Sequence, residues 1–219
     1  MINGIGLTLC RGQHVIINSL DIATDQGSAL IIRGPNGSGK TTFLRAIAGL
    51  LAPQSGTITI GGYNLADDRI NALKSMIYIG HRDGFSGHLT PSENLSIWAA
   101  SRGDDAAIIK AAIPEALDRL GIAALSDTPL FMMSEGQRKR CGLARLSLAL
   151  VMGDDADLRS PYWLLDEPLT ALDHDTTNAV VDLINTHTGQ GGAVLVSSHH
   201  DLSLASAMTM YLNTDGAAS

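Results

Sequence analysis

The chain has 219 residues, with 15 Lys and Arg against 22 Asp and Glu, a length that suits one α/β domain carrying a smaller inserted one. The mildly acidic balance and the lack of a basic run argue against a nucleic-acid partner. The two cysteines, Cys10 and Cys141, make neither a disulfide framework nor a C-x-x-C metal-binding pair. This cysteine content suits a reducing compartment. No signal peptide is visible, and the most apolar stretch, Leu143–Met152, is too short to span a bilayer and contains Arg145.

The first elements of the chain are predicted to be strands that lead into a phosphate-binding loop. Residues 1–33 read as strands joined by polar turns, and the last of them, Ser28–Arg33, is a short apolar run. Gly34–Thr41 then fits the template G-x-x-x-x-G-K-[ST] at every fixed position. A helix should follow, because apolar residues recur on one helical face at Phe43, Leu44, Ile47 and Leu50.

This loop has the composition that phosphate binding requires. Glycines let successive backbone N–H groups point at phosphate oxygens, and the helix dipole adds to the attraction. Lys40 would reach the β- and γ-phosphates of a nucleotide, and the Thr41 hydroxyl would ligate Mg²⁺. The alternative is a Gly-rich turn that fits the template by chance. The predicted nucleotide-binding residues are Gly34, Pro35, Asn36, Gly37, Ser38, Gly39, Lys40, Thr41 and Thr42.

The middle of the chain changes from strands to helices. Thr57–Ile60 alternates in polarity and Met76–Ile79 is a short apolar run, so both read as strands. A loop, His81–Pro91, follows. From Ser92 to about Leu125 the pattern is helical and predicts a helical insertion, whose inward positions are Leu95, Trp98, Ala99, Ile108, Ile109, Ala112, Ile113, Leu117 and Leu120.

A second glycine-bearing motif should begin a long helix. Ser134 and Gln137 form an S-x-x-Q capping box, and Leu143, Leu146 and Leu150 follow at helical spacing. A helix N-terminus with a Ser hydroxyl and a glycine amide can bind an anion, but most capping boxes serve only their own helix. The residues alone leave both interpretations open.

Two carboxylates follow a buried strand. Tyr162–Leu165 delivers Asp166 and Glu167 at its C-terminal end, where open α/β sheets bind ligands. Asp166 would hold Mg²⁺ through water, and Glu167 would take a proton from an attacking water. The alternative is a polar strand end before the turn at Pro168. A later strand, Ala193–Val196, should bring a histidine to the same edge of the sheet.

With these motifs in order, the chain resembles an ABC-type ATPase domain over essentially its whole length. The resemblance implies a P-loop NTPase (RecA-like) core with an antiparallel β-subdomain over residues 1–90 and 141–219, and a helical subdomain over residues 91–140. It implies a head-to-tail homodimer in which the signature motif of one copy completes the ATP site of the other. That motif is Ser134, Glu135, Gly136 and Gln137, Asp173 would lie at the dimer seam, and His199, rather than His200, would sense the γ-phosphate.

The chain departs from the general pattern of that family in three features. His81 stands where a glutamine usually contacts the metal or the water, and neutral imidazole could replace it. Arg11 stands where an aromatic ring usually stacks on adenine, and a guanidinium plane can stack on a base. Met133 and Glu135 replace the commoner Leu and Gly of the signature motif.

The finer resemblance is to the ATP-binding subunits of the cytochrome c maturation haem exporter. It is carried by three stretches: Ile79–Gly84 followed by Leu89–Leu95, Ser134–Arg140 with Leu143–Leu146, and Trp163–Asp173. It implies a Mg²⁺-dependent ATPase without a membrane span, bound peripherally to integral membrane subunits on the cytoplasmic side of the inner membrane.

Several alternatives to this assignment stay open. The chain could serve an ABC transporter with another cargo, or a soluble assembly system such as iron–sulfur scaffold loading. A P-loop kinase or GTPase is disfavoured by the signature motif and by the lack of an N-K-x-D segment. His81 or His88 could also contact haem, although a surrogate for the glutamine and an exposed side chain are the simpler interpretations.

Overall fold

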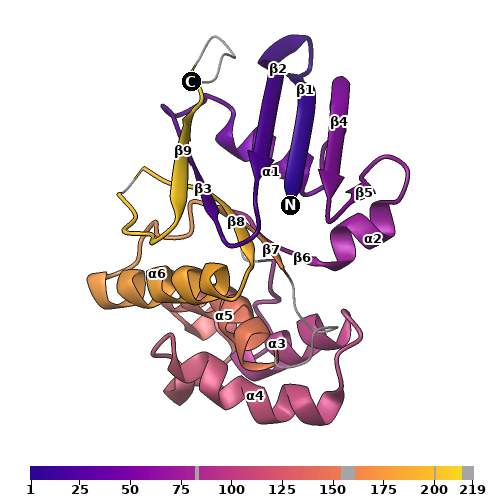
Figure 1. The fold of residues 1–219 in the computed structure, drawn as a ribbon. Coiled ribbons are helices and arrows are strands. Elements are labelled where there is room, and N and C mark those ends of the chain that lie inside the picture. The colour runs from indigo at the N-terminus through magenta and orange to yellow at the C-terminus, as the bar shows by residue number, and fades with distance from the viewer. Residues whose placement is uncertain (82–83, 154–160, 200, 214–219) are drawn as a thin grey trace. The chain divides into compact units, whose positions relative to one another are not determined.

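The computed structural model describes residues 1–81, 84–153, 161–199 and 201–213 (Figure 1). The chain divides into two compact units. The first comprises Met1–Gly80, Ser160–Pro168 and Asn185–Ser219, and the second comprises His81–Arg159 and Leu169–Ile184. The family-implied boundaries at residues 90/91 and 140/141 stay a prediction. Residues 82 and 83 of the predicted loop His81–Pro91, and His200, lie outside the described residues.

The first unit contains an antiparallel sheet, as the resemblance implied. Its strand order is β2-β1-β4-β5. Apolar side chains alternate along β1, and a register shift between Gly4 and Leu7, where Gly6 has a φ of 59°, keeps Leu7 and Leu9 on the buried face. The strands are β1 (Ile2–Arg11), β2 (His14–Thr24), β4 (Ser55–Ile60) and β5 (Tyr63–Asn64).

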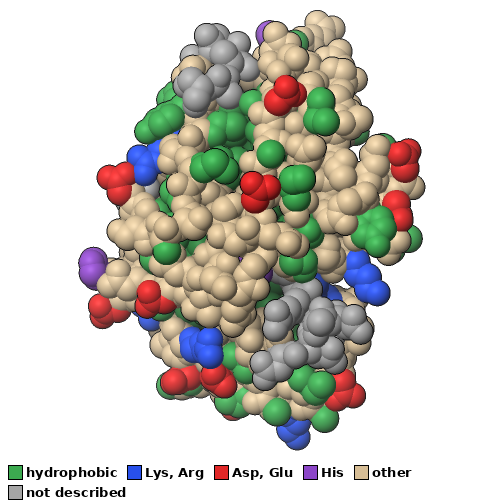
Figure 2. All heavy atoms as spheres, in the orientation of Figure 1, with side chains coloured by type: hydrophobic (Ala, Val, Ile, Leu, Met, Phe, Trp, Pro, Cys, Tyr) green, Lys and Arg blue, Asp and Glu red, His purple; other side chains and the backbone are tan. Residues whose placement is uncertain are grey.

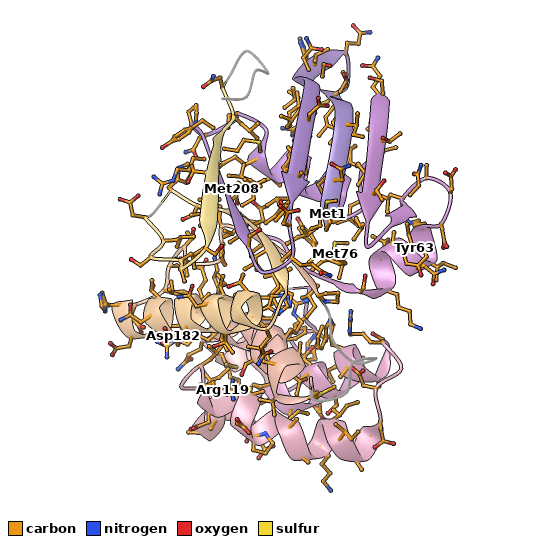
Figure 3. All side chains as sticks on the ribbon, in the orientation of Figure 1. Met1, Tyr63, Met76, Arg119, Asp182 and Met208 are labelled. Atoms are coloured by element: carbon orange, nitrogen blue, oxygen red, sulfur yellow. The ribbon has the colours of Figure 1, made fainter. Side chains whose placement is uncertain are left out.

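The same unit contains a parallel sheet with the order β6-β7-β8-β3-β9. β7 and β8 are buried at every position, as expected for strands covered on both faces. The edge strand β9, whose exposed Met208 is labelled in Figure 3, was not predicted from the sequence. The strands are β3 (Ala29–Arg33), β6 (Met76–Ile79), β7 (Tyr162–Asp166), β8 (Ala193–Ser197) and β9 (Ala207–Tyr211).

Helix α1 (Lys40–Ile47) contacts β1 of one sheet and β7 and β8 of the other, so one apolar core joins both sheets. Its buried residues include Phe43, Leu44 and Ile47, as predicted. The prediction for Leu50 was wrong: the helix ends at Ile47, Gly49 turns the chain with a φ of 67°, and Leu50 is 55% exposed. A short helix, α2 (Arg69–Lys74), is capped by Asp68 and was also not predicted.

The second unit is helical, which confirms the predicted insertion. Thr90 and Glu93 form a capping box at the start of α3, and Asp105 caps α4. Ile108 was predicted to face inward but is 43% exposed, because α4 packs through the neighbouring face that carries Ile109, Ala112 and Ile113. The helices are α3 (Pro91–Ala100), α4 (Ala106–Asp118), α5 (Glu135–Val151) and the first part of α6 (His174–Gly189), with 3₁₀ turns at Ala123–Leu125 and Leu130–Met132.

On the face drawn in Figure 2, the Lys and Arg side chains of the described residues lie scattered among Asp and Glu. Within the same described ranges, every helix is too short or too polar to cross a bilayer.

Candidate active site

The phosphate-binding loop joins β3 to α1, in the strand–loop–helix context that the sequence predicted. Two of its glycines are required by close packing as well as by backbone conformation. Gly34 has a φ of 146°, and a Cβ atom there would lie 2.2 Å from the Leu212 carbonyl oxygen. Gly39 has a φ of 99°, and a Cβ atom there would lie 2.6 Å from Cγ2 of Ile16. Any larger residue at either position would displace the loop.

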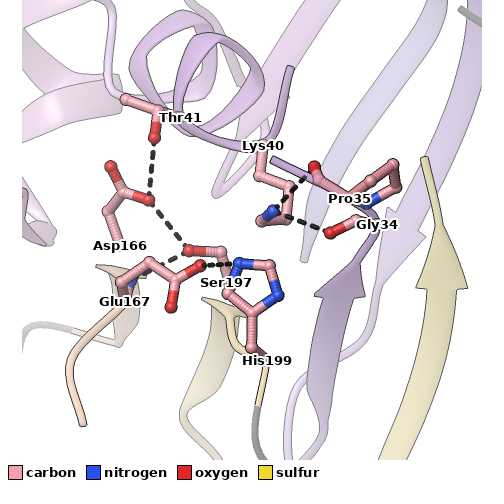
Figure 4. Close-up of polar contacts among 8 residues, drawn as sticks. All are labelled: Gly34, Pro35, Lys40, Thr41, Asp166, Glu167, Ser197 and His199. Carbon is pink, nitrogen blue, oxygen red and sulfur yellow. Dashed lines mark hydrogen bonds and ion pairs between the residues drawn. The ribbon is translucent and has the colours of Figure 1, made fainter. Parts of the chain in front are cut away.

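The loop presents hydrogen-bond donors that suit an anion. Gly39 is the N-cap of α1 and makes no side-chain cap, so the first-turn N–H groups lack that partner. The Lys40 side chain is buried, and its Nζ donates to the carbonyl oxygens of Gly34 at 2.9 Å and Pro35 at 3.2 Å (Figure 4). The buried Ser38 hydroxyl has no hydrogen-bond partner among the described residues. Phosphate oxygens would satisfy these groups.

Asp166 ends β7 and lies beside the loop. It is 2% exposed, and its Oδ1 accepts hydrogen bonds from Thr41 Oγ1 at 3.1 Å and from Ser197 Oγ at 2.8 Å (Figure 4). Its Oδ2 is buried and has no partner in the described part of the chain. One carboxylate and one hydroxyl, with an unused carboxylate oxygen, form the kind of donor set that Mg²⁺ uses when water and substrate phosphates complete its shell. The residues therefore fit this ion.

Glu167 and His199 lie at the same edge of the parallel sheet. They follow β7 and β8, and His199 Nε2 lies 3.1 Å from Glu167 Oε1 (Figure 4). The Glu167 side chain is 20% exposed, so a water molecule can reach it. Glu167 has a φ of 51°, an uncommon value for a residue with a Cβ, and its backbone N–H donates to Ser197 Oγ at 2.9 Å. A carboxylate held in this way can accept a proton from water.

Tyr78 lies on β6, the strand next to β7. Burial raises the pKa of its hydroxyl to about 12, and the negative charge of Asp166 acts in the same direction, while Arg45 opposes them. Tyr78 is therefore uncharged at neutral pH and adds no second negative charge near Asp166.

The signature residues lie in the second unit. Ser134 Oγ accepts the Gln137 N–H at 3.2 Å, and the Gln137 side chain returns to the Ser134 N–H at 2.9 Å, so the predicted capping box is confirmed. Because the Ser134 hydroxyl acts as an acceptor in this box, its own hydrogen is available for an anion. Ser134 and Glu135 are exposed, whereas Gly136 is half-buried and lies close to the Ala171 carbonyl oxygen.

Asp173 joins two elements of the second unit. It pairs with Arg140 of α5, and its Oδ1 accepts the Thr176 N–H at 2.8 Å near the start of α6. Hydrogen bonds from Thr176 and the Arg140 charge lower the pKa of the Asp173 carboxyl. The segment predicted for the dimer seam is thus tied to the helix that carries the signature motif.

For three sequence-predicted residues, no neighbour among the described residues assigns a role. Arg11 ends β1 and is exposed, and His81 opens the second unit and is exposed. The exposed His88 ring lies 6.0 Å from that of Phe131. The functions expected of these residues stay predictions. Conversely, Ser197 was not predicted from the sequence to contact the Asp166 carboxylate and the Glu167 N–H, because those contacts depend on how β8 pairs with β7.

The chain is similar to proteins of a known family over most of its length. The model of the ABC transporter family matches residues 17–170. The chain is 38% identical over 207 residues to the cytochrome c biogenesis ATP-binding export protein CcmA of Paramagnetospirillum magneticum, covering 94% of this chain and 91% of the relative. It is also 38% identical over 197 residues to the protein of the same name from Pseudomonas putida KT2440, covering 90% of this chain and 88% of the relative.

Solved structures give the same fold. An ATP-binding subunit of an ABC transporter matches with a TM-score of 0.83 and 21% identity, over 100% of this chain and 89% of its own. A dimeric ATP-binding cassette in a post-hydrolysis state, bound to ADP and Pi, matches with a TM-score of 0.82 and 22% identity, over 100% of this chain and 98% of its own. The predicted α/β fold class is confirmed.

Proposed function

This chain belongs to the ABC transporter family and is an ATPase of that family, and we propose that it is the Mg²⁺-dependent ATP-hydrolysing subunit of a transporter complex for cytochrome c biogenesis. The observation that carries the hydrolytic function is the meeting of the phosphate-binding loop with Asp166, Glu167 and His199 at one edge of the parallel sheet. The relatives named for cytochrome c biogenesis support the biological role, because they match over nearly the whole chain.

In the proposed mechanism the loop binds the nucleotide phosphates through its backbone N–H groups. Lys40 exchanges the Gly34 and Pro35 carbonyl oxygens for the β- and γ-phosphates, with little movement because its side chain already lies inside the loop. Thr41 and Asp166 would hold Mg²⁺, which supplies positive charge to the phosphates as the bond breaks. Glu167 accepts the proton of the attacking water, and His199 orients the Glu167 carboxylate while contacting the γ-phosphate.

A test of Glu167 separates nucleotide binding from hydrolysis. Glu167→Gln should still bind ATP but should hydrolyse it at least about 100-fold more slowly, the range that a general base contributes. Glu115→Gln makes the same chemical change at an exposed carboxylate that pairs with Arg119, and it should retain wild-type turnover. Phosphate release measured with malachite green decides the question. Turnover by Glu167→Gln close to wild type would remove Glu167 from this role.

We propose further that the active form is a head-to-tail homodimer. The exposed Ser134 hydroxyl and the nearby amide of Gly136 would contact the γ-phosphate bound to the other copy. Glu167→Gln should therefore form a dimer in saturating ATP, as measured by light scattering, and adding Ser134→Arg should abolish that dimer. A monomer under the first condition would contradict this arrangement.

The proposed partners are integral membrane subunits, which would hold the chain peripherally at the cytoplasmic side of the inner membrane. Co-purification from detergent-solubilised membranes should recover those subunits, and a deletion strain should lose its c-type cytochromes. An ATPase for another cargo would co-purify with membrane subunits but leave the cytochromes intact. An ATPase of a soluble assembly system would stay in the soluble fraction.

The proposed cargo is haem. Whether the chain touches it can be tested at His81 and His88, since both are exposed. A Soret shift on adding haem to the purified protein, lost when both residues are changed to Ala, would indicate direct contact. No shift would leave haem handling to the membrane subunits.

A further inference from the structure

We infer that Ser197 is a positioning residue for Asp166 and Glu167, the two carboxylates at the edge of the parallel sheet where ATP would be hydrolysed. It would fix the rotation of the Asp166 carboxylate and hold the backbone of Glu167, and so set the directions in which the two groups face metal and water. This inference rests on the proposed Mg²⁺-dependent hydrolysis of ATP.

The position of Ser197 follows from strand pairing. It is the last residue of β8, its exposed fraction is 0%, and the parallel register places it opposite Asp166 on β7. Its Oγ donates to Asp166 Oδ1 at 2.8 Å and accepts the Glu167 N–H at 2.9 Å. A hydroxyl can donate and accept at once, whereas Ala or Val can do neither. One buried atom therefore serves two consecutive residues.

The bond to Asp166 decides which carboxylate oxygen is left for the metal. Oδ1 receives hydrogen bonds from both Thr41 and Ser197, while Oδ2 is buried without a partner among the described residues. Without Ser197, Thr41 alone would hold the carboxylate, and the group could turn about that single bond. If the position of Oδ2 varied in this way, metal binding would weaken more than the contact of the loop with phosphate.

The bond to Glu167 supports an unfavourable backbone conformation. A residue with a Cβ is strained at the φ of 51° that Glu167 adopts, so the surrounding structure must hold it there. The hydrogen bond from the Glu167 N–H to Ser197 Oγ is one such restraint. Its loss would let the Glu167 side chain leave the position from which it meets His199.

The first experiment uses the protein without nucleotide or metal. Amide hydrogen exchange is followed by NMR in EDTA for wild type, Ser197→Ala and Ser147→Ala. Ser147 is also a buried serine, but its hydroxyl has no partner among the described residues, so it controls for the loss of a buried hydroxyl. The Glu167 amide should exchange about tenfold faster in Ser197→Ala, as expected for one lost hydrogen bond, and should be unchanged in Ser147→Ala. Unchanged exchange in Ser197→Ala would overturn the inference.

The second experiment separates the metal from the nucleotide. A fluorescent ATP analogue is titrated in EDTA and in increasing Mg²⁺, and hydrolysis is measured in parallel. Ser197→Ala should bind the analogue within about twofold of wild type in EDTA, need more Mg²⁺ to reach full affinity, and hydrolyse ATP with a kcat about tenfold lower. An equal loss of affinity with and without Mg²⁺ would show a merely structural role and refute the inference.

A pair of variants of nearly equal size isolates the hydroxyl. Ser197→Thr keeps it and Ser197→Val replaces it with a methyl group, so Thr should retain more activity and a lower Mg²⁺ midpoint than Val. Equal values for the two would count against the inference. If wild type itself showed no Mg²⁺-dependent hydrolysis, the proposed function would fail, whereas a normal wild type with an unaffected Ser197→Ala would refute only the role of Ser197.

Discussion

His187 gives a prediction about acid stability. Its ring stacks on Trp163 of β7, with the ring centroids 3.8 Å apart and the planes 3° from parallel. The residue is 7% exposed, and Nε2 has no hydrogen-bond partner in the described part of the chain. Burial lowers the pKa of His187 to about 4, although a hydrogen bond with the Pro161 backbone opposes this change. The folded protein therefore holds this ring neutral.

The size and sign of the effect follow from the two pKa values. The pKa is 6.5 in the unfolded chain and about 4 in the folded one. Between these values the unfolded chain binds more protons, so the free energy of unfolding falls as the pH falls. A difference of roughly 2.5 units corresponds to about 3 kcal/mol, lost progressively from about pH 6.5 to about pH 4, with no contribution at neutral pH and above.

The assay is urea unfolding of wild type and His187→Asn at a series of pH values. Asn removes the titration and will lower stability at every pH, but titrations shared by both proteins cancel in the difference. The stability of wild type relative to His187→Asn should therefore fall by about 3 kcal/mol between pH 7 and pH 4. His14→Gln, a change at an exposed histidine, is the control. Parallel pH profiles for wild type and His187→Asn would refute the reasoning.

Gly192→Ala, with Gly189→Ala as its control, tests the packing of His187, and Asn94→Ala tests the loop at residues 84–90 of the second unit. A Cβ atom at Gly192 would lie 2.1 Å from His187 Nε2, so Gly192→Ala should displace the stacked ring and cost about 1–3 kcal/mol in thermal unfolding. Gly189→Ala, where a Cβ meets nothing within 4 Å, should stay within about 0.5 kcal/mol of wild type. Asn94 is 5% exposed and its side chain bonds the backbone of Ser86, Leu89 and Thr90. Asn94→Ala should cost about 1–3 kcal/mol and speed proteolysis of the loop, and resistance equal to wild type would contradict this role.

The sequence alone determined the features whose causes are local. The loop Gly34–Thr41 was predicted between a strand and a helix because its fixed glycines and the flanking apolar patterns are all read within a short stretch of chain. The capping box of Ser134 and the strand that ends at Asp166 were predicted for the same reason. Leu50 and Ile108 were placed wrongly, because periodicity does not show where a helix ends or which edge of its apolar face packs. Strand β9 was missed because four of its five residues are exposed and it becomes a strand only by pairing with β3.

Only the tertiary structure decided which of these local features meet. Thr41 and Asp166 are 125 positions apart in the chain, and Ser197 lies 31 positions beyond Asp166, yet all three share hydrogen bonds. That meeting follows from the strand order β6-β7-β8-β3-β9, in which segments distant in sequence become neighbours. The stacking of His187 on Trp163 and the pairing of Arg140 with Asp173 likewise join distant segments. Hydrophobic pattern and secondary-structure propensity depend on a few neighbouring residues. Which parallel strands pair depends instead on segments distant in sequence, and packing of the core decides it.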